Sequence, residues 1–298
     1  LDVLPFPDRE LVNYQEVINK EEGIAKLLFS RGCIFNCSYC SNAALQLLYN
    51  NSYFRLRSPD KAIEEIGGVL SRYKVKRLGF HDDIFTVSRE WFYNFLRLYK
   101  KNFSYPFSCN VRPGTCTQDM FFLLKDAGCE IVGIGVESGD QRLRVEVLNR
   151  QTPDDEIIQT FDFAHRAGLR TTSFNMIGFP CETPESFQKT IDLNAKLMPN
   201  QPYLCVFCPH PGTEMERLIK LGNFEIKQDI LERAEVAFVS PDFTSEEIKY
   251  FFDNFVTLVN KACGINRYTV YLVTKNIKRI YNFLKKTKAS IKSKICRT

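Results

Sequence analysis

The chain has 298 residues, of which 44% are hydrophobic and 25% are charged, and its formal net charge is +5. These values describe an ordinary globular protein of one large or two small domains, and the charge alone is too small to indicate a partner. No run of about 18 apolar residues is present, and Leu1 does not begin a basic and apolar leader, so neither a transmembrane helix nor a signal peptide is expected.

Short apolar segments alternate with helical patterns along the chain. Strands are expected at 25–32, 75–83, 107–112, 130–138, 170–178 and 202–212. Helices are expected at 58–73, 88–101, 117–128, 152–168 and 183–198, and "TEMERLIKLG" (213–222) follows the last strand. Ser58 and Ser88 are suited to cap the first two helices, and Pro59 fits a first helical turn.

This alternation predicts an α/β fold with a parallel sheet and right-handed crossovers. The strands are almost continuously apolar, as in sheets buried on both faces. An open doubly wound sheet and a complete or partial barrel remain open as alternatives, and in each of them a site forms at the carboxyl ends of the strands. We expect a linker-like segment at 1–24, a core at 25–220 and a helical extension with a basic tail at 221–298.

Polar and cysteine-bearing sequences follow the expected strands repeatedly. They are "CIFNCSYC" (33–40), "HDD" (81–83), "NVR" (110–112), "ESG" (137–139), "NMIGFP" (175–180) and "PHPGT" (209–213). Because parallel strands share one carboxyl edge, these segments are expected to gather at one rim and form a site there.

Three of the eleven cysteines, Cys33, Cys37 and Cys40, fall within eight positions. The odd and scattered total indicates reduced thiols in a cytosolic compartment. Thiolates suit zinc or iron–sulfur clusters, but structural zinc usually takes four ligands and no second pair lies near. Three thiolates would hold three irons of a [4Fe–4S] cluster and leave the fourth open. Coincidental core cysteines and a non-enzymatic zinc or iron–sulfur protein are the alternatives.

The C-x3-C-x2-C spacing resembles that of the radical S-adenosylmethionine (SAM) superfamily, over residues 25 to about 220. The resemblance implies a partial six-stranded TIM-like barrel, a [4Fe–4S] cluster and SAM. It also implies reductive cleavage of SAM to a 5′-deoxyadenosyl radical, which is used for methylation or rearrangement of an unactivated carbon. A small-molecule substrate, an electron donor such as flavodoxin or ferredoxin, and a cytoplasmic location are expected.

Further motifs resemble the subclass associated with cobalamin-binding domains. They are "LPFPDRELV", "YFRLRSPDKAIEEI", "GVESGDQRLRVEVLNR", "FNMIGFPCETPESFQKTI" and "PHPGTEM". Two departures stand out, since no Asp-x-His-x-x-Gly stretch occurs and Cys181 replaces the usual Gly of "GFPGET". Cobalamin would therefore enter only through an upstream domain, which we expect the gene to encode. A tRNA-modifying relative is the runner-up, although no separate β-rich RNA-binding domain follows the barrel, so no nucleic-acid partner is expected.

The resemblance implies a role for several residues besides the cluster cysteines. Tyr39 would lie near the adenine, and Asp82 or Asp83 would meet the SAM amine. Packing is the alternative for Tyr39. Helix capping, solvation or an Asp/His metal site with His81 are the alternatives for the acids.

The later motifs supply further candidate contacts. Glu137 and Ser138 would approach the ribose or the methionyl end, and Arg150 would pair with the SAM carboxylate. A surface arginine is the alternative for Arg150. The strand residues expected near the adenine, or in the core, are Asn175, Met176 and Gly178. Arg112 could face substrate.

Two features lie outside these motifs. Cys205 and Cys208 form a C-x2-C that could hold an auxiliary cluster or act as a redox pair, but strand alternation would send them to opposite faces. The chain after Asp253 has no acidic residue. This basic tail could contact nucleic acid or an anionic membrane surface, with a solvated helix as the alternative.

Overall fold

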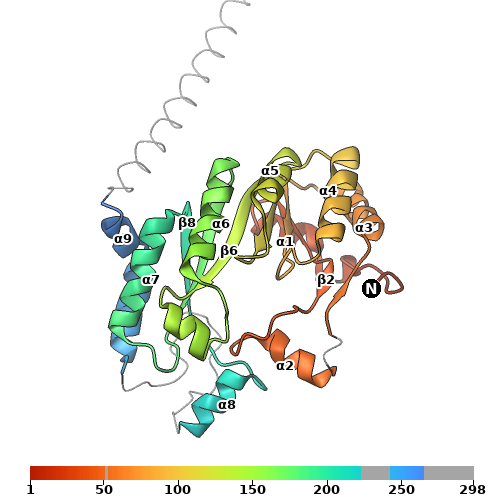
Figure 1. The fold of residues 1–298 in the computed structure, drawn as a ribbon. Coiled ribbons are helices and arrows are strands. Elements are labelled where there is room, and N and C mark those ends of the chain that lie inside the picture. The colour runs from red at the N-terminus through yellow and green to blue at the C-terminus, as the bar shows by residue number, and fades with distance from the viewer. Residues whose placement is uncertain (51–52, 223–241, 265–298) are drawn as a thin grey trace, which may run out of the picture.

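The computed structural model describes residues 1–50, 53–222 and 242–264. Its main sheet has six parallel strands in the order β1-β4-β5-β6-β7-β8. Their bounds are Ile24–Leu27, Arg77–Phe80, Phe107–Val111, Cys129–Glu137, Arg170–Ile177 and Gln201–Val206. The sheet curls with helices around it (Figure 1). In the described part of the chain, β1 and β8 are the two edge strands of this sheet and do not pair with each other, so the barrel is not closed. The predicted partial barrel is therefore confirmed.

The crossover helices follow the predicted alternation closely. They are α3 (Pro59–Arg72), α4 (Arg89–Asn102), α5 (Gln118–Asp126), α6 (Asp154–Arg166) and α7 (Pro184–Leu197). The hydroxyl of Ser58 accepts a bond from the Lys61 amide, and that of Ser88 accepts one from the Trp91 amide, so both predicted caps are confirmed. After β8 come α8 (Glu214–Leu221) and α9 (Ser245–Ala262), and α9 packs against α7 and β8.

The first and last strands are shorter than predicted. β1 ends at Leu27, and Ser30–Arg31 (β2) pairs instead with Arg55–Leu56 (β3) in a small antiparallel ribbon. Asp82 fixes this departure, because its Oδ1 accepts bonds from the amides of Phe29 and Ser30 at 2.9 and 2.6 Å. β8 ends at Val206, and the chain then enters a proline-containing loop, where proline has no amide to donate to a ladder.

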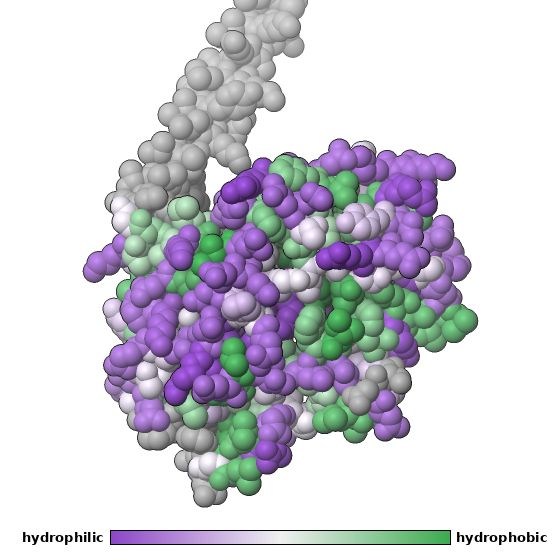
Figure 2. Space-filling model, viewed as in Figure 1, coloured by the Kyte–Doolittle hydropathy of each residue, from purple (hydrophilic) through white to green (hydrophobic). Residues whose placement is uncertain are grey.

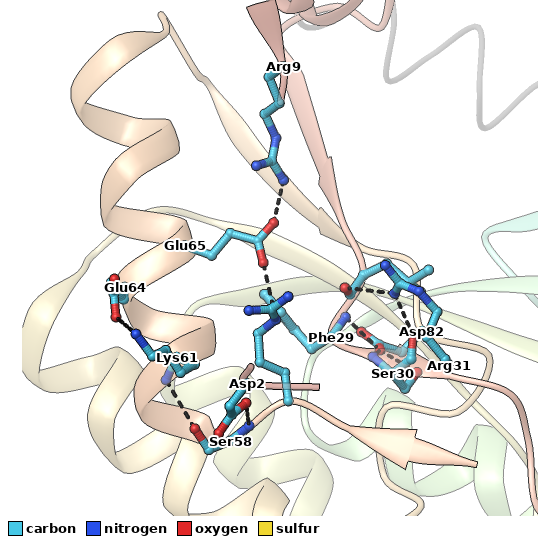
Figure 3. A network of polar contacts seen from close by, with 12 residues as sticks. Asp2, Arg9, Phe29, Ser30, Arg31, Ser58, Lys61, Glu64, Glu65 and Asp82 are labelled. Atoms are coloured by element: carbon cyan, nitrogen blue, oxygen red, sulfur yellow. Dashed lines mark hydrogen bonds and ion pairs between the residues drawn. The ribbon is translucent and has the colours of Figure 1, made fainter. Parts of the chain in front are cut away.

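The segment 1–24 contains a 3-10 turn, Glu10–Val12, and helix α1, Tyr14–Lys20. Arg9 donates to the carboxylate of Glu65 on α3 at 2.5 Å, and Figure 3 shows the two side chains pointing toward one another. The other oxygen of Glu65 lies 3.7 Å from Nε of Arg57. Glu65 and Arg57 are buried, so this pair of arginines around one carboxylate anchors the segment to the barrel.

At the other end, only part of the predicted extension 221–298 can be described. Phe255 and Val259 of α9 pack with Phe187 of α7 and Leu204 of β8, which covers the outer side of the β8 edge. The basic tail beyond residue 264 lies outside the described residues. No helix in the described ranges is long and apolar enough to cross a membrane.

Candidate functional site

Two adjoining cavities of about 240 Å³ and about 610 Å³ lie at the carboxyl ends of the strands. They share four lining residues, Tyr39, Cys40, Glu137 and Phe174. The smaller cavity is bounded by the cysteine loop and the ends of β4, β5 and β6, and the larger one by β7, β8 and the loop after β8. The expected gathering of the motifs at one rim is therefore present.

Cys33, Cys37 and Cys40 all line the smaller cavity, on the loop between β2 and α2 (Ser41–Leu48). This loop is fixed from outside by Ser38, whose amide donates to Leu148 O at 3.0 Å and whose hydroxyl donates to Val147 O at 2.6 Å. Burial raises the pKa of Cys33, and it raises the pKa of Cys40 to about 11. As free thiols, Cys33 and Cys40 would stay protonated, so a ligand that binds thiolate is needed to deprotonate them.

Two buried arginines line the smaller cavity together with Cys37. Arg112 donates from Nη1 to Cys37 Sγ at 3.3 Å and from Nη2 to the Thr152 hydroxyl at 3.4 Å, and its guanidinium lies 3.9 Å from the ring centre of Phe35. Arg150 is also buried and lines the same cavity. These positive charges would offset thiolate charge, which suits a thiolate-bound centre.

A [4Fe–4S] cluster fits this donor set. In the described ranges no three His, Cys, Asp or Glu side chains are placed to hold a single metal ion. A cluster makes a different demand, since each of its irons takes its own thiolate. Three cysteines on one loop that lines a cavity, with arginines on the same cavity, meet that demand.

Glu137 ends β6 and points into both cavities. Its φ is +68°, in the left-handed region that a residue with a Cβ rarely adopts, and the β6–β7 register shifts between Gly135 and Glu137. Arg150 donates to Gly135 O at 2.6 Å and lies 3.8 Å from Glu137 Oε1. Burial raises the pKa of Glu137, although the Arg150 charge and a hydrogen bond from Tyr39 act in the opposite direction.

Two glycines keep the smaller cavity open. A Cβ on Gly133 would lie 2.5 Å from the Phe174 ring and 2.6 Å from Asn110 Oδ1. A Cβ on Gly135 would lie 2.5 Å from Glu137 Oε1 and 3.0 Å from Arg150 Nη2. The "GIG" of "GIGVESG" therefore leaves space for the charged pair.

The structure separates the two acids after β4. Asp82 is 2% exposed and binds the backbone after β1, so it holds the chain in place (Figure 3). Asp83 lines the smaller cavity, and its Oδ2 accepts a bond from Asn42 Nδ2 at 2.9 Å. Ser138 is fully buried, and its hydroxyl accepts from the Asp140 amide at 3.2 Å in the turn after β6.

The residues predicted on β7 also separate. Asn175 and Met176 line the larger cavity, and the Asn175 amide group donates to Tyr203 O at 3.0 Å. Gly178 has φ +89° and donates its amide to Glu182 Oε2 at 2.6 Å. Glu182 is fully buried, and sequence reasoning assigned it no role. The signal was available in "GFPCET", where the only acid follows a tight glycine turn.

Cys205 and Cys208 both line the larger cavity. The alternation argument against joint ligation holds only within a strand, and it does not apply here because β8 ends at Val206, between the two. Their proposed redox or auxiliary role stays a prediction.

Comparison with known proteins identifies the family. The model of the radical SAM superfamily matches residues 27–193. The chain belongs to the radical SAM superfamily. Membership implies a [4Fe–4S] cluster and SAM as cofactors, in agreement with the cysteine loop and its cavity.

Relatives and solved structures of this family agree. An uncharacterised methyltransferase of Pyrococcus horikoshii is 28% identical over 253 residues, 83% of this chain and 54% of the relative. An anaerobic magnesium-protoporphyrin IX monomethyl ester cyclase of Rubrivivax gelatinosus is 25% identical, over 79% of this chain and 41% of the relative. The chain thus spans about half or less of their length.

A radical SAM methyltransferase from Kitasatospora setae, solved with cobalamin and a [4Fe–4S] cluster, shares the fold. Its TM-score is 0.58 at 17% identity, over 68% of this chain and 38% of that one.

Proposed function

We propose that this chain is the catalytic core of a radical SAM enzyme, with Cys33, Cys37 and Cys40 as the ligands of a [4Fe–4S] cluster. When bound and reduced, the cluster supplies the electron that cleaves SAM to methionine and a 5′-deoxyadenosyl radical. The observation that carries this proposal is the three-cysteine loop in one cavity, which two buried arginines also line and where Arg112 donates to Cys37 Sγ. The barrel at 25–220 would be the unit that performs this step, with flavodoxin or ferredoxin as the donor.

The charged wall of the smaller cavity matches the charges of SAM. Arg150 could bind the SAM carboxylate through its guanidinium fork, and Asp83 could accept from the ammonium. Asp83 is preferred to Asp82, whose Oδ1 already takes bonds from Phe29 and Ser30. Glu137 could accept from the ribose hydroxyls.

The adenine would then reach the larger cavity beside Tyr39 and Met176. The backbone of Asn175, also on that wall, could hydrogen-bond to the base. Gly178 and Ser138, which do not line either cavity, would act through the turns they form.

The reaction outcome that we propose is methylation or another change at an unactivated carbon of a small molecule. Support comes from the relatives named as a methyltransferase and a cyclase. Cobalamin enters this proposal only through a module outside the described residues.

Anaerobic reconstitution with iron and sulfide tests the cluster. The protein should turn brown, hold about four irons and form 5′-deoxyadenosine from SAM and a reductant. Cys33→Ala/Cys37→Ala/Cys40→Ala should lose the colour, and the control Cys181→Ala, an exposed thiol, should keep it. Full iron retention in the triple variant would refute the assignment, and a colourless protein with one zinc would indicate the zinc alternative.

Calorimetric titration with SAM tests the charged wall. Glu137→Gln should weaken SAM binding by about 1.5–3 kcal/mol with the iron content unchanged, because a charged acceptor is lost. The matched control is Glu214→Gln, an exposed carboxylate on α8. Unchanged affinity in Glu137→Gln would place SAM elsewhere on the rim.

A further inference from the structure

The larger cavity has two chemically different walls. On the side of the cysteine loop lie the charged groups of Glu137 and, in the adjoining cavity, Asp83, Arg112 and Arg150. Along β8 and the loop after it, residues 203–211, "YLCVFCPHP", contain no Asp, Glu, Lys or Arg. Eight of these nine residues line the cavity. Apart from His210, they have no basic or amide group in their side chains, and they are Tyr203, Cys205, Val206, Phe207, Cys208, Pro209 and Pro211.

From this wall we infer that the part of the substrate that enters the larger cavity is uncharged and apolar. The inference rests on the proposed function, since it assumes that SAM takes the charged side and that its adenine, beside Tyr39 and Met176, leaves the wall of residues 203–211 to the substrate. It excludes substrates that would bring a phosphate or carboxylate against β8.

The apolar wall is rigidly built. The Phe174 and Tyr203 rings meet edge to face with centres 6.0 Å apart. Phe207 is 2% exposed, and its ring centre lies 4.9 Å from that of Phe179 behind it. Aromatic contacts of this kind hold the wall in one arrangement.

Asn175 of β7, next to this wall, has a polar side chain that is already hydrogen-bonded. Asn175 donates to Tyr203 O at 3.0 Å and to the Ser173 hydroxyl at 3.1 Å, and its Oδ1 accepts from Asn194 at 2.8 Å. A charged ligand group placed against residues 203–211 would lose its hydration and find no Asp, Glu, Lys or Arg in that stretch to pair with, which is unfavourable. His210, at the end of the stretch, is its one imidazole.

Exposed leucines near the mouth form a competing apolar surface. α2 begins at Ser41, which lines the larger cavity, and α8 begins just after the loop that lines it, where the Met215 amide donates to Ser38 O at 2.9 Å. Leu48 on α2 is 77% exposed and Leu221 on α8 is 65% exposed. Figure 2 shows apolar residues over both helices at the lower edge of the view. The experiment must separate this surface from the cavity.

Two fluorescent probes with the same ring system make the test. N-phenyl-1-naphthylamine is uncharged, and 8-anilino-1-naphthalenesulfonate is its sulfonated analogue. Each would be titrated against the full chain with SAM present after reconstitution. We expect the uncharged probe to bind at least about tenfold more tightly than the sulfonate.

Variants then locate the bound probe. Tyr203→Glu puts a charge on the cavity wall at a half-exposed position and should weaken binding of the uncharged probe at least about tenfold, whereas Tyr203→Phe should retain it. Leu48→Glu/Leu221→Glu and the distant control Leu11→Glu, which is 82% exposed in the parent chain, should leave binding unchanged. Circular dichroism confirms the fold of each variant.

Three results would overturn the inference: equal or tighter binding of the sulfonate, unchanged binding in both Tyr203 variants, or a loss confined to the Leu48→Glu/Leu221→Glu variant. Failure of the proposed function is recognised separately. Absence of 5′-deoxyadenosine from SAM without any added substrate would refute that proposal, whichever probe binds.

Discussion

Replacement of Arg112 by Gln should make the cluster harder to reduce. Arg112 is 6% exposed and donates to Cys37 Sγ at 3.3 Å, so its charge faces a ligand sulfur. Reduction adds one negative charge to the cluster, and a nearby positive charge favours that state. Arg112→Gln removes the charge while keeping a polar side chain, and the reduction potential should become more negative.

The size of this shift follows from the geometry. At 3.3 Å and an effective dielectric constant of about 20, two unit charges interact with about 5 kcal/mol. The added electron is shared over the whole cluster, so only part of this energy applies, and about 1.5–3 kcal/mol is expected for a charge-assisted bond. For a one-electron couple, this corresponds to about 65–130 mV.

A redox titration followed by electron paramagnetic resonance measures the potential. Only samples with the parental iron content would be compared. Arg112→Lys, which keeps the charge but loses the fork, should shift the potential less, and the surface control Arg142→Gln should not shift it. A potential within about 20 mV of the parent in Arg112→Gln would show that Arg112 does not act on the cluster.

Three further predictions concern stability. Glu65→Ala leaves the buried Arg57 and the partly buried Arg9 without their carboxylate and should lower the free energy of unfolding by about 3–5 kcal/mol in urea. The neighbouring Glu64→Ala, at an exposed position, should change it by under about 1 kcal/mol, and equal losses would contradict the buried role of Glu65. Cys181 has φ +64°, so Cys181→Gly should raise the free energy of unfolding by about 0.5–1 kcal/mol, a gain that Cys181→Ala should not give. Burial raises the pKa of Glu182 from 4.5 to about 8, so the native state holds the extra proton between these values and stability should fall as the pH rises from about 4.5 to 8. Glu182→Gln should remove that decline in urea unfolding at pH 5.5 and 8.5; a parallel decline in the variant would contradict it.

The sequence predicted the architecture well because the relevant signals are local. Serine caps, glycine helix ends and apolar strand segments recur in each βα step, and a parallel sheet built from such steps has few possible orders. The predicted bounds of β1 were wrong because a residue distant in the sequence determines where this strand ends. "AKLLFSRG" is apolar enough for a long strand, but Asp82, more than 50 positions away, captures the amides of Phe29 and Ser30.

The candidate site also combines features that local sequence signals predicted with features that depend on distant contacts. The cysteine spacing predicted that three thiols would share one cavity, which the structure shows, although their role as cluster ligands stays a proposal. Asp82 and Asp83 were equally good candidates from the sequence, because adjacent residues differ in direction and only the fold shows which one faces the cavity. Arg112 received little weight for a similar reason, since its contact with Cys37 joins positions 75 apart. Helix α2 was missed because its apolar residues remain largely outside the core.

Glu137 shows why residue type alone is insufficient at such a site. The motif "GIGVESG" indicates an acid at a strand end, but an ordinary extended backbone would send successive side chains to alternate faces. The register shift and the φ of +68° redirect the Glu137 carboxylate toward Arg150 and the cavities. Such a conformation costs about 1–2 kcal/mol for a residue with a Cβ, and it persists only where surrounding contacts over-determine it. Arg150 provides them by binding both Gly135 O and the Glu137 carboxylate, and Gly135 leaves room for this arrangement. The left-handed backbone of Glu137, the absence of a Cβ at Gly135 and the charge of Arg150 therefore act together to direct one carboxylate. A change in any of them should alter ligand binding at the cavities more than it alters the stability of the barrel.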